Sequence, residues 1–280
     1  MSTEQVHTGS EPAKSDLKVR AIAGVVMAAV AIGLLWLGGL AFLTLTLVIG
    51  ALVLREWCTV TGAGQPRIVY LLALTLLAAG FGLAGAGNWP MGFALTLGGG
   101  AFLGLAGLVL KQRSLRWVGP GLIYAAVPAL ALAWLRHLPD GFKIVLWVMV
   151  AVAMTDTCAY FAGRRFGGPK LAPRISPKKT WSGLIGGTIG AALSGWVLGA
   201  LFGLPLEKAI WLAGGAAVLA VVSQMGDLGE SALKRAFDVK DSGSILPGHG
   251  GIMDRVDGLV AAAPLVALAE LFGLGIGALL

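Results

Sequence analysis

Residues 21–54 read AIAGVVMAAVAIGLLWLGGLAFLTLTLVIGALVL and contain no charged side chain. A helix needs about 20 apolar residues to cross the hydrocarbon core of a bilayer, so this stretch is long enough for two crossings. Gly38 and Gly39 lie where the first helix should end, and they predict a break there. Without that break, the stretch would form one long helix or a re-entrant hairpin. A cleavable signal peptide has a shorter apolar region, so we expect the segment to be retained.

Similar apolar runs recur along the whole chain of 280 residues, which is 57% hydrophobic and only 12% charged. Soluble domains carry about 25% charged residues. The runs are continuous rather than alternating, which favours helices over a transmembrane barrel. The sequence therefore predicts an all-α, polytopic integral membrane protein with about nine transmembrane helices, or eight without the break at Gly38. The expected spans are 21–37, 39–54, 68–86, 92–110, 119–135, 143–163, 182–203, 208–226 and 257–279.

The basic residues predict the orientation of these spans. With the N-terminus in the cytoplasm, all but three of the 21 Lys and Arg fall in cytoplasmic segments; the exceptions are Arg136, Lys143 and Lys208. Cytoplasmic loops of membrane proteins are enriched in Lys and Arg, so the bias supports this orientation. It also explains most of the net charge of +7 through anionic lipid headgroups, without a nucleic-acid partner. We expect a multi-pass protein of a bacterial inner membrane whose polar loops form a cytoplasmic active site.

The chain divides into three expected parts. Residues 1–20 mix acidic and basic side chains and predict a disordered cytoplasmic tail, residues 21–140 form N-terminal transmembrane helices, and residues 141–280 form the catalytic transmembrane domain. Most of the 43 glycines are expected to allow close helix packing. Cys58 and Cys158 form no CxxC pair and suggest neither a disulfide framework nor a metal site.

Asp156 is an acidic residue inside the sixth expected span, and Tyr160 follows one helical turn later on the same face. Ionisable groups within a membrane are costly and usually functional. The simpler interpretation is a carboxylate paired with a basic residue for packing.

Residues 170–183 read KLAPRISPKKTWSG. Ser176 followed by Pro177 predicts a helix N-cap and first helical residue, which would start the seventh span and place Lys178 and Lys179 in its first turn. Helix N-termini repel cations but bind phosphate, so the pattern makes sense if an anion binds there. The alternative is two lysines that obey the positive-inside rule.

Asp227 and Glu230 share one face of a helix that emerges from the eighth span, and Lys234 lies four residues beyond Glu230. A simple ion pair explains Glu230 and Lys234. Asp227 has no basic residue nearby in sequence, so its partner should be a metal ion or a residue from another span.

The stretch ILPGHGGIMDRVDG, residues 245–258, precedes the last span. If that helix begins near Ile252, Asp254 and Asp257 project to the same side and would repel each other unless a cation lies between them. Mg²⁺ binds through one or two carboxylates and substrate phosphates. Arg255 points elsewhere and could hold a phosphate or a carboxylate.

These residues resemble the signature of the phosphatidate cytidylyltransferases, the CDP-diacylglycerol synthases. The resemblance is carried by Ser231, Lys234, Arg235, Lys240, Asp241, Pro247, His249, Gly250, Gly251, Asp254, Arg255 and Asp257. The upstream blocks DTCAYFAGRRFG and LAPRISPKKTWSG also resemble blocks of that family. Cys158 stands where the family usually has glycine, and Ser182 stands where it often has glutamate. The likeness is strong over residues 150–264.

The resemblance implies that CTP and phosphatidic acid react to give CDP-diacylglycerol and pyrophosphate, with one or two Mg²⁺ ions and a homodimeric enzyme. Asp227, Lys234, Asp254 and Asp257 are the expected catalytic residues, and the three aspartates are the expected metal ligands. The expected substrate-binding residues are Asp156, Tyr160, Ser176, Lys178, Lys179, Thr180, Arg235, Lys240, Asp241, His249 and Arg255.

Three other classes fit less well. CDP-alcohol phosphatidyltransferases use clustered aspartates, but Asp257-Gly258 lacks the Ala-Arg that their motif requires. Polyprenol-type lipid kinases share a broadly similar membrane design that uses CTP. A secondary transporter would use Asp156 and Asp227 for ion coupling, but transporters normally show related halves, and here the charged blocks lie only in the second half.

Overall fold

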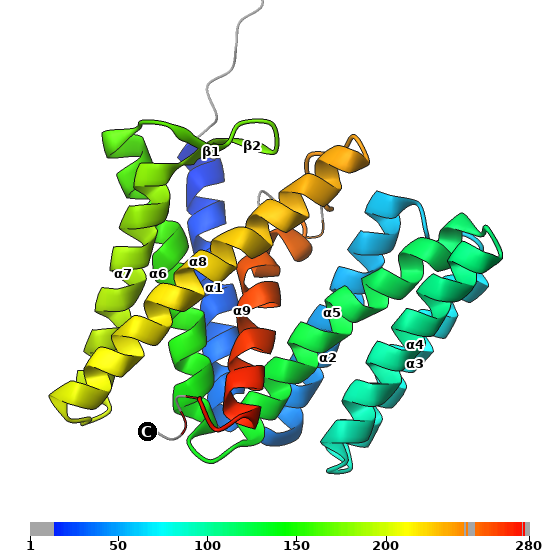
Figure 1. The fold of residues 1–280 in the computed structure, drawn as a ribbon, viewed down its shortest axis with the longest axis horizontal. Coiled ribbons are helices and arrows are strands. Elements are labelled where there is room, and N and C mark those ends of the chain that lie inside the picture. The colour runs from blue at the N-terminus through cyan, green and yellow to red at the C-terminus, as the bar shows by residue number, and fades with distance from the viewer. Residues whose placement is uncertain (1–13, 244, 246–249, 276, 278–280) are drawn as a thin grey trace, which may run out of the picture.

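The computed structural model describes residues 14–243, 245, 250–275 and 277 (Figure 1). These residues form nine α-helices and one β-hairpin. In chain order the elements are α1 Lys14–Leu37, α2 Gly39–Thr61, α3 Arg67–Gly85, α4 Trp89–Val109, α5 Arg113–His137, α6 Gly141–Phe166, β1 Lys170–Ala172, β2 Ser176–Thr180, α7 Trp181–Leu201, α8 Leu206–Ala236 and α9 Met253–Leu271.

The predicted break between the first two helices is confirmed. Gly38 and Gly39 have φ of 63° and 50°, a left-handed backbone that ends α1 and starts α2. The guanidinium of Arg136 lies over this break and donates to the carbonyl oxygens of Leu35 at 2.6 Å and Trp36 at 3.1 Å. A basic side chain therefore satisfies carbonyls that the end of α1 leaves unpaired.

Several predicted helix boundaries were wrong. Helix α1 already begins at Lys14, so residues 14–20 are helical and only residues 1–13 of the predicted tail lie outside the described part of the chain. Helix α2 continues to Thr61, seven residues beyond the expected end at Leu54, and α9 ends at Leu271 instead of 279. Polar residues at the start of α1 and the end of α2 are thus helical although hydropathy alone places them outside the spans, whereas the last helix is shorter than its apolar stretch.

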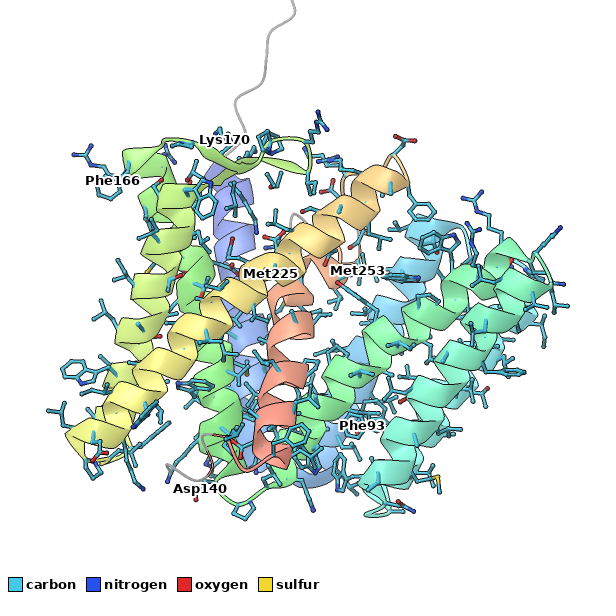
Figure 2. The ribbon with its side chains drawn as sticks, viewed as in Figure 1. Phe93, Asp140, Phe166, Lys170, Met225 and Met253 are labelled. Atoms are coloured by element: carbon cyan, nitrogen blue, oxygen red, sulfur yellow. The ribbon has the colours of Figure 1, made fainter. Side chains whose placement is uncertain are left out.

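The connections alternate between the two ends of the helical layer (Figure 1). The hairpin, the C-terminal end of α8 and the N-terminal end of α9 lie toward one end. Phe166 and Lys170 mark that end, whereas Asp140 and Phe93 lie toward the other (Figure 2). Helix α8 runs obliquely across the bundle and packs against α6, α7 and α9. The hairpin and the described ends of the connection between α8 and α9 therefore lie at the same end of the molecule.

Seven helices, α2 through α8, are long and apolar enough to cross a bilayer. The apolar part of α1 that can be assessed is the shorter stretch Gly24–Leu37, and α9 carries Asp254, Arg255, Asp257 and Glu270. The protein is thus an all-helical polytopic membrane protein with a single short hairpin among its described residues.

Small residues hold α6 and α7 together. A Cβ added at Gly186 would lie 2.3 Å from the Cβ of Ala162, and one at Gly190 would lie 2.3 Å from the sulfur of Cys158. Only glycine permits this close approach of the two helices, which is a common way to pack helices in lipid. The interface fixes the end of α6 beside the start of α7, and therefore holds the hairpin between them.

Candidate active site

The predicted start of the seventh span at Ser176 is wrong. Residues Ser176–Thr180 form strand β2, which pairs antiparallel with β1 through Ala172 with Ser176 and Lys170 with Thr180. Helix α7 begins only at Trp181, and its N-cap is Thr180, whose hydroxyl accepts a hydrogen bond from the N–H of Gly183 at 3.1 Å. Thr180 meets the same capping preference as serine and is the last residue of β2, directly before the helix, so it takes the cap position.

The strand changes the roles available to the two lysines. Consecutive side chains of a strand point to opposite faces, whereas a first helical turn would have gathered both. Lys178 is exposed. The ammonium of Lys179 instead contacts the carboxylate of Asp227 on α8 at 2.5 Å and donates to the side-chain oxygen of Gln224 at 2.9 Å. Only Lys179 is therefore brought to the polar groups of α8.

Gln224 connects Lys179 to the predicted Asp156. Its amide nitrogen donates to the carboxylate of Asp156 at 3.2 Å, while its oxygen accepts from Lys179. On the other side, Asp227 also accepts from the hydroxyl of Ser231 at 3.3 Å. The expected partner of Asp227 from another segment is thus Lys179. Together these contacts join α6, β2 and α8.

Asp257 joins the same group from α9. Its carboxylate accepts a hydrogen bond from the N–H of Gly258 at 2.7 Å and lies within electrostatic range of Asp227 and Asp156. The backbones of α8 and α9 approach closely here, because a Cβ at Gly226 would lie 2.6 Å from the carbonyl oxygen of Asp257. We call Asp156, Asp227 and Asp257 the carboxylate cluster.

Asp254 has different surroundings from Asp257. One carboxylate oxygen lies 2.5 Å from the ammonium of Lys234, and the other accepts from the N–H and the hydroxyl of Ser242 and the N–H of Gly251 at 3.0, 2.8 and 2.9 Å. Lys234 also pairs with Glu230 at 2.9 Å, as the spacing of four residues predicts. Lys234 therefore neutralises Asp254. The carboxylate of Asp254 in turn holds the backbone of Ser242 and Gly251 together ahead of α9, an arrangement that we call the clamp.

The carboxylate cluster offers oxygen donors to a metal ion but does not enclose one. The part of the chain that the structure describes contains no group of three acidic, histidine or cysteine side chains arranged to enclose one. A Mg²⁺ ion that binds substrate phosphates needs only one or two carboxylates, however, and keeps water as its other ligands. Asp227 and Asp257 supply oxygen donors of that kind, so their chemistry fits the ion. Asp254, with its four hydrogen-bonding partners, fits a positioning role better.

The remaining predicted residues that the structure describes come from α6, β2, α8, α9 and the segment between α8 and α9. Tyr160 is 58% exposed, and its hydroxyl accepts from Arg164 at 2.8 Å, so it faces outward and not toward Asp156. Arg235 donates to the carbonyl of Val239 at 3.3 Å. His249 lies outside the described residues. Ser176 is half-buried at the start of β2, whereas Arg235, Lys240, Asp241 and Arg255 are exposed, as Tyr160 is.

Three residues at the site were missed from the sequence. Gln224 bridges Lys179 and Asp156, Tyr124 of α5 donates to Glu230 at 3.3 Å, and Glu56 of α2 contacts the segment before α9. Glu56 gave a usable signal, since it stands directly before the apolar run Trp57-Cys58. It was assigned to a loop because the second span was ended at Leu54. Gln224 and Tyr124 gave no comparable signal.

The geometry can be compared with known proteins. The family model described as the cytidylyltransferase family matches residues 18–272. The chain belongs to this family. It is 42% identical over 266 residues to the phosphatidate cytidylyltransferase of Brucella suis biovar 1, which covers 92% of this chain and 94% of the relative. It is 36% identical over 279 residues to the phosphatidate cytidylyltransferase of Pseudomonas aeruginosa, which covers 94% of this chain and 99% of that relative.

The match extends over most of the chain, residues 18–272, and not only over the charged C-terminal blocks. The phosphatidate cytidylyltransferase of Staphylococcus haemolyticus is 32% identical over 258 residues, which covers 89% of this chain and 97% of the relative. The chain is therefore a membrane-bound nucleotidyltransferase of the cytidylyltransferase family. Its N-terminal helices, for which the sequence predicted only hydrophobic character, lie within the matched region.

Proposed function

We propose that the protein transfers the cytidylyl group of CTP to phosphatidic acid, producing CDP-diacylglycerol and pyrophosphate for phospholipid synthesis. The observation that carries this proposal is the meeting of Lys179, from the hairpin, with the carboxylate cluster of α6, α8 and α9. Negatively charged phosphates need cationic groups, and carboxylates can supply them by binding a divalent ion. The relatives named phosphatidate cytidylyltransferase support the choice of substrates.

The reaction needs alignment and charge neutralisation more than acid–base chemistry. A nonbridging oxygen of the lipid phosphate forms a bond to the α-phosphorus of CTP, while the bond from that phosphorus to the β-bridging oxygen breaks. Pyrophosphate leaves with the electron pair. The lipid phosphate already carries nearly two negative charges at neutral pH, so it needs no strong base. Lys179 stabilises the negative charge that gathers at the reacting phosphates.

Asp227 and Asp257 are proposed to hold one Mg²⁺ ion, with Asp156 beside them. When bound, the ion would polarise the phosphoryl oxygens and neutralise part of their charge. Asp156 keeps Gln224 oriented by accepting its amide hydrogen, and Gln224 in turn accepts from Lys179. Asp156 and Gln224 therefore fix the ammonium of Lys179 next to Asp227. A second metal ion stays a prediction.

The location of the site suits a substrate that is half in the membrane. The cluster lies on the C-terminal half of α6 and of α8 and at the N-terminal end of α9, the end of the bundle that carries the hairpin (Figure 1). We propose that this end faces the cytoplasm of a bacterial inner membrane, where CTP is available, and that the lipid keeps its acyl chains in the bilayer. The homodimer stays a prediction.

A doubly labelled substrate tests the proposal. The purified protein is incubated in detergent with phosphatidic acid, Mg²⁺ and CTP labelled either at the α-phosphorus or at the γ-phosphorus. Cytidylyl transfer puts the α-label in the lipid product and the γ-label in pyrophosphate. The proposal fails if the lipid acquires the γ-label, which is the result for a kinase, or if no labelled lipid forms with any divalent metal.

A further inference from the structure

Glu56 is a buried carboxylate in the N-terminal half of the protein. It lies on α2 and is only 2% exposed. Burying a carboxylate is costly unless hydrogen bonds compensate for the lost water. The hydrogen-bond partners of Glu56 therefore indicate its role. All the partners that the structure describes come from the segment before α9 and from the start of that helix.

The carboxylate of Glu56 caps α9 from another helix. It accepts hydrogen bonds from the backbone N–H groups of Ile252 at 2.9 Å and Met253 at 2.7 Å. The N-cap position of α9 is Ile252, which offers no side-chain cap. The first N–H groups of a helix have no partner within the helix, and a negative charge there is favourable. Glu56 supplies both the acceptor and the charge.

The backbone on both sides of the connection packs against this carboxylate. A Cβ added at Gly243 would lie 2.8 Å from one carboxylate oxygen, and one at Gly251 would lie 2.6 Å from the other. Met253 is fully buried and packs within the core that α2, α3 and α5 share. In Figure 2 Met253 lies next to the C-terminal half of α8. Helix α2 thus holds the described ends of the connection, residues 242–243 and 250–253, against its own C-terminal turns.

Ser242 connects Glu56 to the predicted site residues. Its buried hydroxyl lies 3.2 Å from the carboxylate of Glu56 and 2.8 Å from that of Asp254, so its single proton is shared by two acceptors. Asp254 then pairs with Lys234, which pairs with Glu230. The chain of contacts runs from α2 through the connection to α9 and α8.

We propose that Glu56 is a positioning residue for cytidylyl transfer. It touches neither Lys179 nor the carboxylate cluster in any contact given by the structure, and acts through Ser242, Asp254 and the first turn of α9. By fixing where α9 begins, it sets the place of Asp257, one turn further along, opposite Asp227. The inference rests on the proposed function, since it assigns this arrangement to that reaction.

Two small substitutions separate positioning from bulk stability. Glu56→Gln keeps the volume, but only one of its two terminal atoms accepts hydrogen bonds. Ser242→Ala removes the hydroxyl that joins Glu56 to Asp254, but it keeps the backbone N–H bond to Asp254 and leaves the cap on α9 intact. Thr61→Val is the matched control, because Thr61 is fully buried on the same helix and its hydroxyl donates within that helix, to the carbonyl of Trp57. Turnover and both KM values are measured per folded enzyme, after size-exclusion chromatography of the full chain in detergent.

We expect kcat of Glu56→Gln to fall at least tenfold while its KM for phosphatidic acid stays within twofold of wild type. Ser242→Ala should lower kcat in the same direction, and the double variant should fall no more than twofold below Glu56→Gln, since both act through one chain of contacts. Thr61→Val should keep kcat within twofold. A Glu56→Gln enzyme with kcat within twofold of wild type, or multiplied losses in the double variant, overturns the inference. If Glu56→Gln gives no folded protein, Ser242→Ala decides alone: a fall in kcat of more than twofold supports the inference, and a kcat within twofold of wild type overturns it.

Hydrogen exchange keeps this test separate from the proposed function. In Glu56→Gln, amides of Ser242, Ile252 and Met253 should exchange at least tenfold faster than in wild type, while those of α4 should not change. Unchanged exchange at these amides refutes the positioning role whether or not the enzyme makes CDP-lipid. A wild-type protein that makes no CDP-lipid refutes the proposed function and leaves the exchange result to be judged by itself.

Discussion

Lys178 and Lys179 are adjacent in sequence, yet the structure predicts very different effects when each is replaced by alanine. The ammonium of Lys179 contacts Asp227 at 2.5 Å and Gln224 at 2.9 Å, and its side chain is only 16% exposed. Lys178 is exposed and lies on the other face of β2. The first-turn helix expected from the sequence would have given both lysines the same importance.

The size of the Lys179→Ala effect follows from its sheltered position. A pair of exposed charges contributes about 0–1 kcal/mol, whereas removal of one preorganised donor to a developing oxyanion costs roughly 2.7–4 kcal/mol in a protected site. At 1.36 kcal/mol for each factor of ten, kcat should fall about 10²–10³-fold. Lys178→Ala removes a solvated charge, and its kcat should fall by roughly threefold or less.

The assay measures CDP-lipid formation by both purified variants at saturating CTP and phosphatidic acid. Circular dichroism and elution volume establish that each variant is folded. Equal losses in the two variants would refute the argument, because they would mean that the strand does not separate the two side chains. A Lys179→Ala enzyme with more than a tenth of wild-type kcat would also contradict it.

Three further predictions concern the cluster, the clamp and the helix packing. Asp257→Asn should lower kcat at least 10²-fold and abolish the response to added Mg²⁺. The control Asp238→Asn, at an exposed position with a φ of 55° that asparagine also adopts, should retain the wild-type kcat and the response to Mg²⁺. A magnesium-dependent Asp257→Asn enzyme of near-normal rate would exclude Asp257 as a ligand. Asp254→Asn should lower the midpoint of thermal unfolding as well as kcat, because it leaves Lys234 half-buried with one fewer charged partner, and an unchanged midpoint would argue against the clamp. Gly186→Ala should destabilise the protein by about 1–3 kcal/mol through its contact with Ala162, while Gly98→Ala, where a Cβ meets no atom within 4 Å, should not, and equal unfolding midpoints would contradict the packing argument.

Hydropathy predicted most of the helices because it reports directly on the solvent of each segment, whereas the orientation predicted from the charges stays a prediction. The Gly38-Gly39 break and the helical nature of the chain followed from apolar length and local breakers, whereas the last helix begins at Met253 and not at the expected residue 257. The end of α2 was missed, since Glu56 reads as a loop residue until its partners on α9 are known. Burial of a charge depends on contacts distant in sequence, which hydropathy does not contain.

The site was predicted in its composition more than in its pairing. Asp156, Lys179, Asp227 and Asp257 do gather, from four different elements. Asp254 and Asp257 were expected to share a cation because they lie three residues apart on one helix. Lys234 reaches Asp254 instead, since α8 crosses α9 obliquely and carries this lysine to the first turn. Spacing along one helix cannot reveal what a neighbouring helix brings.

The fate of the phosphate oxygens tests the central claim most directly. Phosphatidic acid carrying ¹⁸O at its three nonbridging phosphate oxygens is converted with unlabelled CTP, and the ¹⁸O content of each product is measured by mass spectrometry. If the lipid phosphate attacks the α-phosphorus, CDP-diacylglycerol retains all three labelled oxygens and pyrophosphate contains none. Labelled pyrophosphate, or a lipid product without cytidine, would contradict cytidylyl transfer to phosphatidic acid.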